Sequence, residues 1–90
     1  MMRAESRPVD VIALCSAGGE IRPLRLRMED EQSRPFRVDI DEVVSTKRIT
    51  YVGVEAQLFL CKATVWGREW LFELKYAFRT HNWQMVRRIH

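Results

Sequence analysis

The side chains able to act as nucleophiles or bases are few and lie far apart in the sequence. The chain has two histidines, His81 and His90, and two cysteines, Cys15 and Cys61. A thiolate beside an imidazole forms a nucleophilic pair, so Cys61–His81 and Cys15–His81 are the couples to consider. No phosphate-binding loop, dinucleotide-binding motif or nucleophile elbow accompanies them. We therefore expect a protein that is not an enzyme and that uses no cofactor.

Carboxylates gather in one short segment, at Asp39, Asp41 and Glu42. Alternate residues of a strand share a face, and carboxylate oxygens are the ligands that hard cations prefer. The segment lacks the glycine and the ligand spacing of an EF-hand loop. We expect instead that these acids lie on the outer face of a sheet and pair with Arg25 or Arg37, so no metal site is predicted.

Both cysteines are isolated, because no Cys-x-x-Cys motif occurs. The first eight residues, MMRAESRP, have no apolar core of the signal-peptide type, and no apolar run approaches the roughly 18 residues of a membrane-spanning helix. Free thiols fit a reducing compartment, so we expect a cytoplasmic protein in which both cysteines are buried. The distance between Cys15 and Cys61, on which a disulfide depends, stays open.

Charge is unevenly divided along this chain of 90 residues, whose net charge is +3. Residues 1–42 carry seven basic and nine acidic side chains, whereas residues 43–90 carry eight basic and three acidic ones. The second half can face a polyanion, but a dedicated nucleic-acid domain normally shows a stronger excess of one sign. The length fits one globular domain, which we place at residues 9–90 after a flexible segment at residues 1–8.

Apolar residues recur at every second position through most of the chain, which indicates strands. Residues 9–16 and 21–28 predict a hairpin around Gly18-Gly19, and Pro23 places this hairpin at a sheet edge. The predicted cross-strand pairs are Asp10–Arg27, Val11–Leu26, Ile12–Arg25 and Ala13–Leu24. The alternation that begins at Phe36 breaks at residues 41–44, which predicts a β-bulge before a strand at residues 45–52 and a turn at residues 52–56.

A second hairpin joins residues 57–66 to residues 69–78 through a two-residue turn at Gly67-Arg68. Its predicted pairs are Val65–Trp70, Ala63–Phe72, Cys61–Leu74, Phe59–Tyr76 and, on the other face, Lys62–Glu73. After a turn at residues 79–82, the final strand is expected to point Trp83, Met85 and Ile89 inward and Gln84, Val86 and Arg88 outward. Arg87 breaks this pattern, and we expect its stem to pack while its guanidinium reaches solvent at the barrel end.

These strands predict an all-β fold, an antiparallel meander of six to seven short strands. One apolar face, a bulge and two edges to protect favour curling into a small barrel or half-barrel.

The outer face of the second hairpin carries an apolar patch ringed by charge, which is typical of a surface that binds protein. We therefore expect a non-enzymatic module that binds a protein partner or forms a homodimer, and no contact with membranes. The expected contact residues are Leu60, Lys62, Trp66, Arg68 and Leu71.

Small barrels also bind single-stranded nucleic acid by stacking bases on exposed aromatic side chains within a basic groove. The alternative function is therefore a weak, sequence-tolerant nucleic-acid binder. Its expected contact residues are Trp66, Arg68, Lys75, Arg87 and Arg88.

Four segments give the chain a family resemblance: IRPLRLR at residues 21–27, DEV at residues 41–43, FELKY at residues 72–76 and WQMVRRI at residues 83–89. With these, the chain resembles short uncharacterised bacterial all-β domains, in which an arginine-rich strand precedes a curled sheet that closes on a tryptophan strand. The resemblance covers residues 9–90 and implies the fold and a bacterial cytoplasm. It assigns no catalytic or binding residues.

Overall fold

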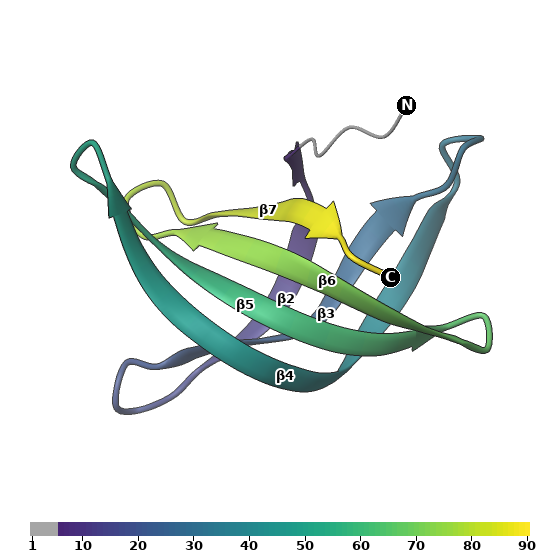
Figure 1. The fold of residues 1–90 in the computed structure, drawn as a ribbon, viewed down its shortest axis with the longest axis horizontal. Helices are drawn as coiled ribbons and strands as arrows, with labels where there is room; N and C mark the ends of the chain where they lie inside the picture. The colour runs from purple at the N-terminus through teal and green to yellow at the C-terminus, as the bar shows by residue number, and fades with distance from the viewer. Residues whose placement is uncertain (1–5) are drawn as a thin grey trace.

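The fold is a single antiparallel sheet of seven strands curled into a half-barrel, seen in a computed structural model that describes residues 6–90 (Figure 1). The strands are β1 (Arg7–Pro8), β2 (Asp10–Cys15), β3 (Ile21–Glu29), β4 (Pro35–Tyr51), β5 (Val54–Val65), β6 (Arg68–Ala77) and β7 (Asn82–Arg88). Their order in the sheet is β1-β7-β6-β5-β4-β3-β2, which confirms the predicted all-β meander. Within the described residues, no helix is long and apolar enough to cross a membrane.

The N-terminal segment, which comprises β1 and β2, pairs with strands at both ends of the sheet order. In β1, Arg7 lies opposite Met85 and Pro8 opposite Gln84, and the Val9 N–H donates to the Trp83 carbonyl at 3.2 Å. From Asp10 onward the same chain pairs with β3 instead. The described strands thus begin at Arg7, two residues before the predicted domain boundary, while residues 1–5 of the predicted flexible segment lie outside the described part of the chain.

The core lies on the concave face of the sheet, and β5 and β6 supply most of it. Alternate residues of these two strands are buried, as the period of two predicts. The buried apolar residues are Leu26, Val38, Ala56, Phe59, Cys61, Ala63, Val65, Trp70, Phe72, Leu74 and Met85. Phe72, Leu74 and Cys61 have no exposed surface at all, so the centre of this hairpin is the centre of the core.

The register of the β5–β6 hairpin differs from the prediction by two residues. The turn is Trp66-Gly67 and not Gly67-Arg68, and both residues have positive φ (50° and 78°), as a type I′ turn requires. The predicted partners of β5 were therefore wrong; the observed pairs include Val65–Arg68, Ala63–Trp70, Cys61–Phe72, Phe59–Leu74, Lys62–Leu71 and Leu60–Glu73. Because a shift of two keeps the parity, every side chain stays on its predicted face.

In the β2–β3 hairpin the prediction is confirmed only far from the turn. Asp10–Arg27, Val11–Leu26 and Ile12–Arg25 are paired as predicted, but Ala13 lies opposite Pro23 because a bulge leaves Leu24 unpaired. The connection is also longer than Gly18-Gly19, since the Ser16 N–H donates to the Glu20 carbonyl at 2.8 Å. Pairing of β3 with β4 starts only at Arg25, so Pro23 lies at an edge as predicted.

Strand β4 bends the sheet. Its register shifts between Ile40 and Glu42 and again between Val43 and Ser45, which confirms the predicted bulge. Residues 35–39 pair with β3, and from Ile40 onward β4 pairs with β5, so β4 carries the sheet from one side of the half-barrel to the other. The predicted turn at residues 52–56 is shorter than expected, because Val52-Gly53 alone makes it with φ values of 51° and 76°.

A bulge in β7 that the sequence did not predict reverses the orientation of the last residues. Glu73 lies opposite Arg87 and Leu74 opposite Met85, so Val86 is the extra residue. The guanidinium of Arg88, expected outside, therefore lies over the Trp70 ring at 4.3 Å, and Ile89, expected inside, is 44% exposed. Arg87 does not pack at the barrel end but places Nε 3.5 Å from the Glu73 carboxylate.

Candidate functional site

The two cysteines differ in environment, and neither forms a hydrogen bond to a histidine within the described residues. Cys61 is completely buried and its Sγ lies 3.6 Å from the Phe59 carbonyl. This burial raises the pKa of the Cys61 thiol from 9.0 to about 12, so the thiol stays protonated. Cys15 is exposed, contrary to the expectation that both are buried, because it ends an edge strand. His81 instead shares a 2.8 Å hydrogen bond with the Tyr76 hydroxyl.

In the acidic segment of β4, Asp39 is paired with arginines and Asp41 is hydrogen-bonded to a neighbouring strand. Asp39 lies 2.8 Å from Arg25 and 3.4 Å from Arg37, which confirms the predicted pairing. Asp41 accepts a hydrogen bond from the Thr64 hydroxyl at 3.0 Å. In the part of the chain that the structure describes, no three acidic, histidine or cysteine side chains are grouped to hold a metal ion.

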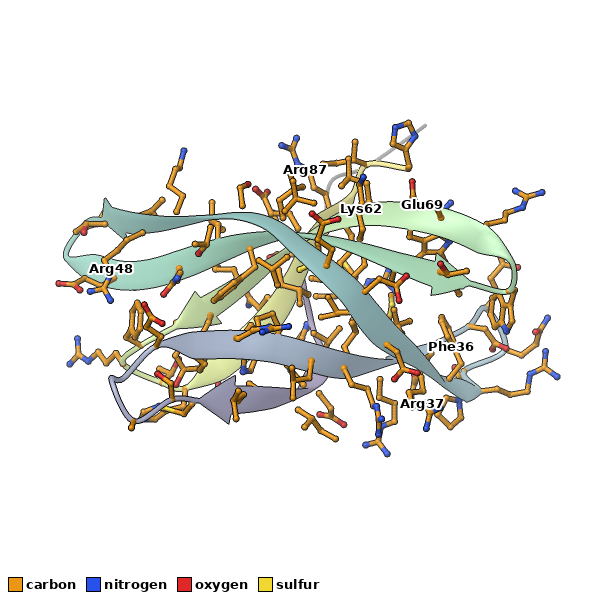
Figure 2. All side chains as sticks on the ribbon, turned by 90° about the horizontal axis from the view of Figure 1, so that it is seen from below. Phe36, Arg37, Arg48, Lys62, Glu69 and Arg87 are labelled. Carbon is orange, nitrogen blue, oxygen red and sulfur yellow. The ribbon has the colours of Figure 1, made fainter. Side chains whose placement is uncertain are left out.

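The structure divides the predicted protein-contact residues into two groups. Lys62 and Leu71 are direct cross-strand neighbours and Leu60 lies opposite Glu73, so these three occupy the outer face of the central hairpin, where all are half-buried. Figure 2 shows Lys62 and Arg87 on this same side of the sheet. Trp66 and Arg68 lie instead at the β5–β6 turn, at one end of the half-barrel.

Trp66 belongs to an aromatic group at that end of the molecule. Its ring centroid is 4.7 Å from that of Phe36, and Phe36 in turn makes an edge contact with Trp70 at 6.3 Å. Figure 2 places Phe36 near the β5–β6 turn and Arg48 at the opposite end. We call this surface the tryptophan rim; its residues are Phe36, Trp66, Arg68, Trp70 and Arg88.

The Trp66 side chain is both exposed and held in place. It is 74% exposed, although its ring rests on Phe36. Its φ of 50° is a conformation that bulky residues rarely adopt and that costs of order 1–3 kcal/mol. The contact between the Trp66 and Phe36 rings stabilises this conformation by about 0.5–1.5 kcal/mol, which offsets part of the strain. The turn therefore holds an exposed indole where asparagine or glycine would be less strained.

Arg88 is the rim residue whose position the sequence could not show. Its guanidinium covers the Trp70 ring at 4.3 Å because the bulge at Val86 turns it inward. The other basic residues of the nucleic-acid alternative lie elsewhere: Arg87 pairs with Glu73, and Lys75 lies between Leu58 and Gln84. That set is therefore divided between the rim and the outer face.

The opposite end of the half-barrel holds a second aromatic group, which differs from the rim in being covered. The Trp83 ring lies 5.5 Å from Phe59 and 4.9 Å from Tyr76, and it is half-buried. The Arg48 guanidinium lies 4.5 Å from the centre of the Phe78 ring. The aromatic rings at this end are buried or half-buried, and among the described residues an exposed tryptophan is found only at the rim.

Comparison of the chain with known proteins gave no match among family models, curated proteins or solved structures. The resemblance to bacterial all-β domains is supported in its coarse form, an all-β fold.

Proposed function

We propose that the protein is a non-enzymatic interaction module that binds another protein or a second copy of itself, and that the tryptophan rim is a main contact surface. The observation that carries this proposal is Trp66, a 74% exposed indole held at a φ of 50° in a two-residue turn. Backbone strain at an exposed, ordered side chain suggests a function for that side chain, since folding alone favours other residues there.

The composition of the rim favours a protein partner. Tryptophan and arginine are the residues most enriched among those that dominate binding energy at protein interfaces. The contact with Phe36 fixes the indole before binding, which lowers the entropy lost when a partner docks. The adjacent Arg68 and Arg88 suit a partner that presents an apolar side chain beside carboxylates.

The outer face of the central hairpin is a second proposed contact area, formed by Leu60, Lys62 and Leu71. Glu73 lies directly opposite Leu60 and pairs with Arg87, so this face is mixed in charge. Its side chains are half-buried by their neighbours, and it therefore offers less apolar surface than the rim.

Site-specific photo-crosslinking tests the proposed role of the rim. A benzophenone amino acid replaces Arg68 in one variant, which keeps Trp66, and Val54 in the control; both residues are exposed and directly follow a two-residue turn. We expect a discrete crosslinked protein only from position 68, and we expect excess parent protein, but not excess Trp66→Ser, to abolish it. Equal crosslinking at both positions contradicts the proposal.

Single-stranded nucleic acid is the alternative partner, and one observation favours it. Phe36 contacts both the exposed Trp66 and the buried Trp70, on which the Arg88 guanidinium is stacked. An exposed indole on the same surface as a guanidinium is an arrangement on which bases can stack. Titration of fluorescent oligonucleotides at low and at physiological salt separates the two functions. A nucleic-acid binder loses affinity steeply as salt rises, whereas a protein-binding module shows no such salt-dependent binding.

We also propose a cytoplasmic location in a bacterial cell. The support is the resemblance of the four sequence segments, together with two cysteines that are both free, one exposed and one buried. Fractionation of the producing cells tests this location directly.

A further inference from the structure

Strand β2 is an open edge of the sheet. It is the last strand in the sheet order, and its only ladder among the described strands is with β3. Residues 11–15 (VIALC) contain no charge and no proline, which are the usual protections of an edge strand. The side chains of Ile12 and Leu14 are 57% and 52% exposed. Unpaired backbone and exposed apolar side chains therefore occur on the same strand.

The hydrogen bonds on either side of β2 show which backbone groups are unpaired. The Ser16 N–H points toward the β3 side, where it donates to the Glu20 carbonyl, whereas the Val9 N–H points the other way, to the Trp83 carbonyl. Backbone groups of successive strand residues alternate in direction. The N–H and C=O groups that face the open edge therefore belong to Val11, Ala13 and Cys15.

We propose that this edge pairs with β2 of a second copy of the chain, in an antiparallel ladder whose two-fold axis passes beside Ala13. Ala13 then lies opposite Ala13 of the second copy, and Val11 opposite its Cys15. Each such pair exchanges two N–H···O=C bonds, and all three outward-facing residues of both strands are used. The inference rests on the proposed function as an interaction module, but it uses a surface separate from the tryptophan rim.

The side chains agree with this register. It places Ile12 opposite Leu14 of the second copy, as a pair without backbone hydrogen bonds, in which side chains approach most closely. The four exposed apolar side chains of the two strands then cover one another on the outer face. The contact is isologous, so it closes at a dimer and leaves no further β2 edge free.

Neighbouring registers fit less well. One shifted register places Ile12 opposite Ile12 of the second copy, and Leu14 then lies opposite an Asp10. In this register Cys15 lies opposite Val9, whose N–H already donates to the Trp83 carbonyl. A shift in the other direction places Leu14 opposite its copy and leaves Val11 facing Ala17, which belongs to the turn and not to β2. Only the register centred on Ala13 matches apolar residues throughout and uses every free group.

Sedimentation equilibrium over a wide concentration range tests the dimer. We expect the parent to dimerise and Ile12→Lys to raise the dissociation constant at least tenfold, because a lysine on the edge opposes pairing. Ala13→Pro should do the same, since it removes an outward N–H that the monomer does not use. Val54→Lys, at another exposed apolar position, is the matched control and should dimerise like the parent.

Disulfide trapping tests the register, with Cys15→Ser as the background. Oxidised Ile12→Cys/Leu14→Cys should give a covalent dimer, because these positions face each other. Either single cysteine should not, since diagonal neighbours lie about 7–8 Å apart, beyond the reach of a disulfide. Efficient trapping of one single variant overturns the register.

A parent that stays monomeric at millimolar concentration, or a dimer insensitive to Ile12→Lys, overturns the edge pairing itself. Thermal melts check that both edge variants are folded. If Ala13→Pro does not fold, Ile12→Lys alone tests the edge pairing. Trp66→Ser distinguishes this inference from the proposed function: it should dimerise like the parent while failing to compete for the partner that is crosslinked at the rim. A dimer lost only in Trp66→Ser assigns self-association to the rim and contradicts the edge model.

Discussion

The two hairpins β5–β6 and β2–β3 are built from similar apolar residues but use them differently. The central hairpin has β4 on one side and β7 on the other, so its backbone is paired along both margins and its inner side chains are buried (Figure 1). In the edge hairpin, β2 pairs with β3 alone among the strands that the structure describes, and Ile12 and Leu14 are exposed to solvent. Place in the sheet order, and not hydrophobicity, decides whether an apolar residue stabilises the fold or remains free for contact.

The largest difference should appear at Phe72, in the centre of the core. Phe72→Ala should lower the free energy of unfolding by about 3–5 kcal/mol, because it removes a fully buried ring and leaves a cavity. Urea unfolding measures this loss, and Leu71→Ala, on the opposite face of the same strand, is the control with the smaller loss. Equal effects of the two substitutions would contradict the assignment of the inner face.

Cys61 gives the central hairpin a dependence on pH. Its pKa in the folded state is raised to about 12 by burial, so the unfolded state releases this proton first as pH rises above 9. The stabilisation that comes from burying the protonated thiol is fully present below pH 9. Between pH 9 and 12 the free energy of unfolding falls by up to about 1.4 kcal/mol per pH unit. The free energy of unfolding of Cys61→Ala should fall less steeply with pH in this range, and a slope equal to that of the parent would contradict this account.

The two turns with positive φ offer a finer contrast. Val52→Asn should stabilise the protein by about 0.5–1 kcal/mol. Val52 is strained in its left-handed backbone conformation, which asparagine tolerates, and the valine side chain is 83% exposed, so little packing is lost. Trp66→Asn gains the same backbone relief but loses the contact with Phe36, so its net change should be smaller. Thermal melts of the two variants compare them; a larger gain at position 66 would show that the indole contributes nothing to the fold.

The smallest effect on stability should come from the edge. Ile12→Lys should change the free energy of unfolding of the monomer by less than about 0.5 kcal/mol, since its side chain lies mostly in solvent. Chemical unfolding at a concentration well below that of dimer formation is the appropriate measurement. A loss close to that of Phe72→Ala would mean that the edge hairpin belongs to the core.

Sequence alternation predicted the strands, the inner face and the bulge in β4, because burial of one sheet face imposes a period of two on the residues. It did not predict the turns. The predicted turn of the central hairpin has Gly67 at its first position, whereas the observed turn has Trp66 there at positive φ. The predicted inner and outer faces of β5 and β6 are nevertheless correct, because moving a two-residue turn by one residue shifts the register by two and keeps each side chain on its face.

The rim could be predicted only in part. The exposure of Trp66 followed from the outer face on which the alternation placed it, but its contact with Phe36 joins residues that are distant in sequence. The predicted face of Arg88 is wrong because the break in the alternation at Arg87 was explained by an arginine that reaches solvent from an inner position, whereas the structure has a bulge at Val86. The break is visible in the sequence, but long-range packing decides between these two explanations.

The seam between β1 and β7 has a consequence for the order of folding. Arg7 lies opposite Met85 and Pro8 opposite Gln84, so this seam joins residues separated by almost the whole described chain. Pairing them closes a long loop, which costs more chain entropy than pairing two consecutive strands. The meander from β3 to β6 pairs only consecutive strands, so we expect it to form before the seam does.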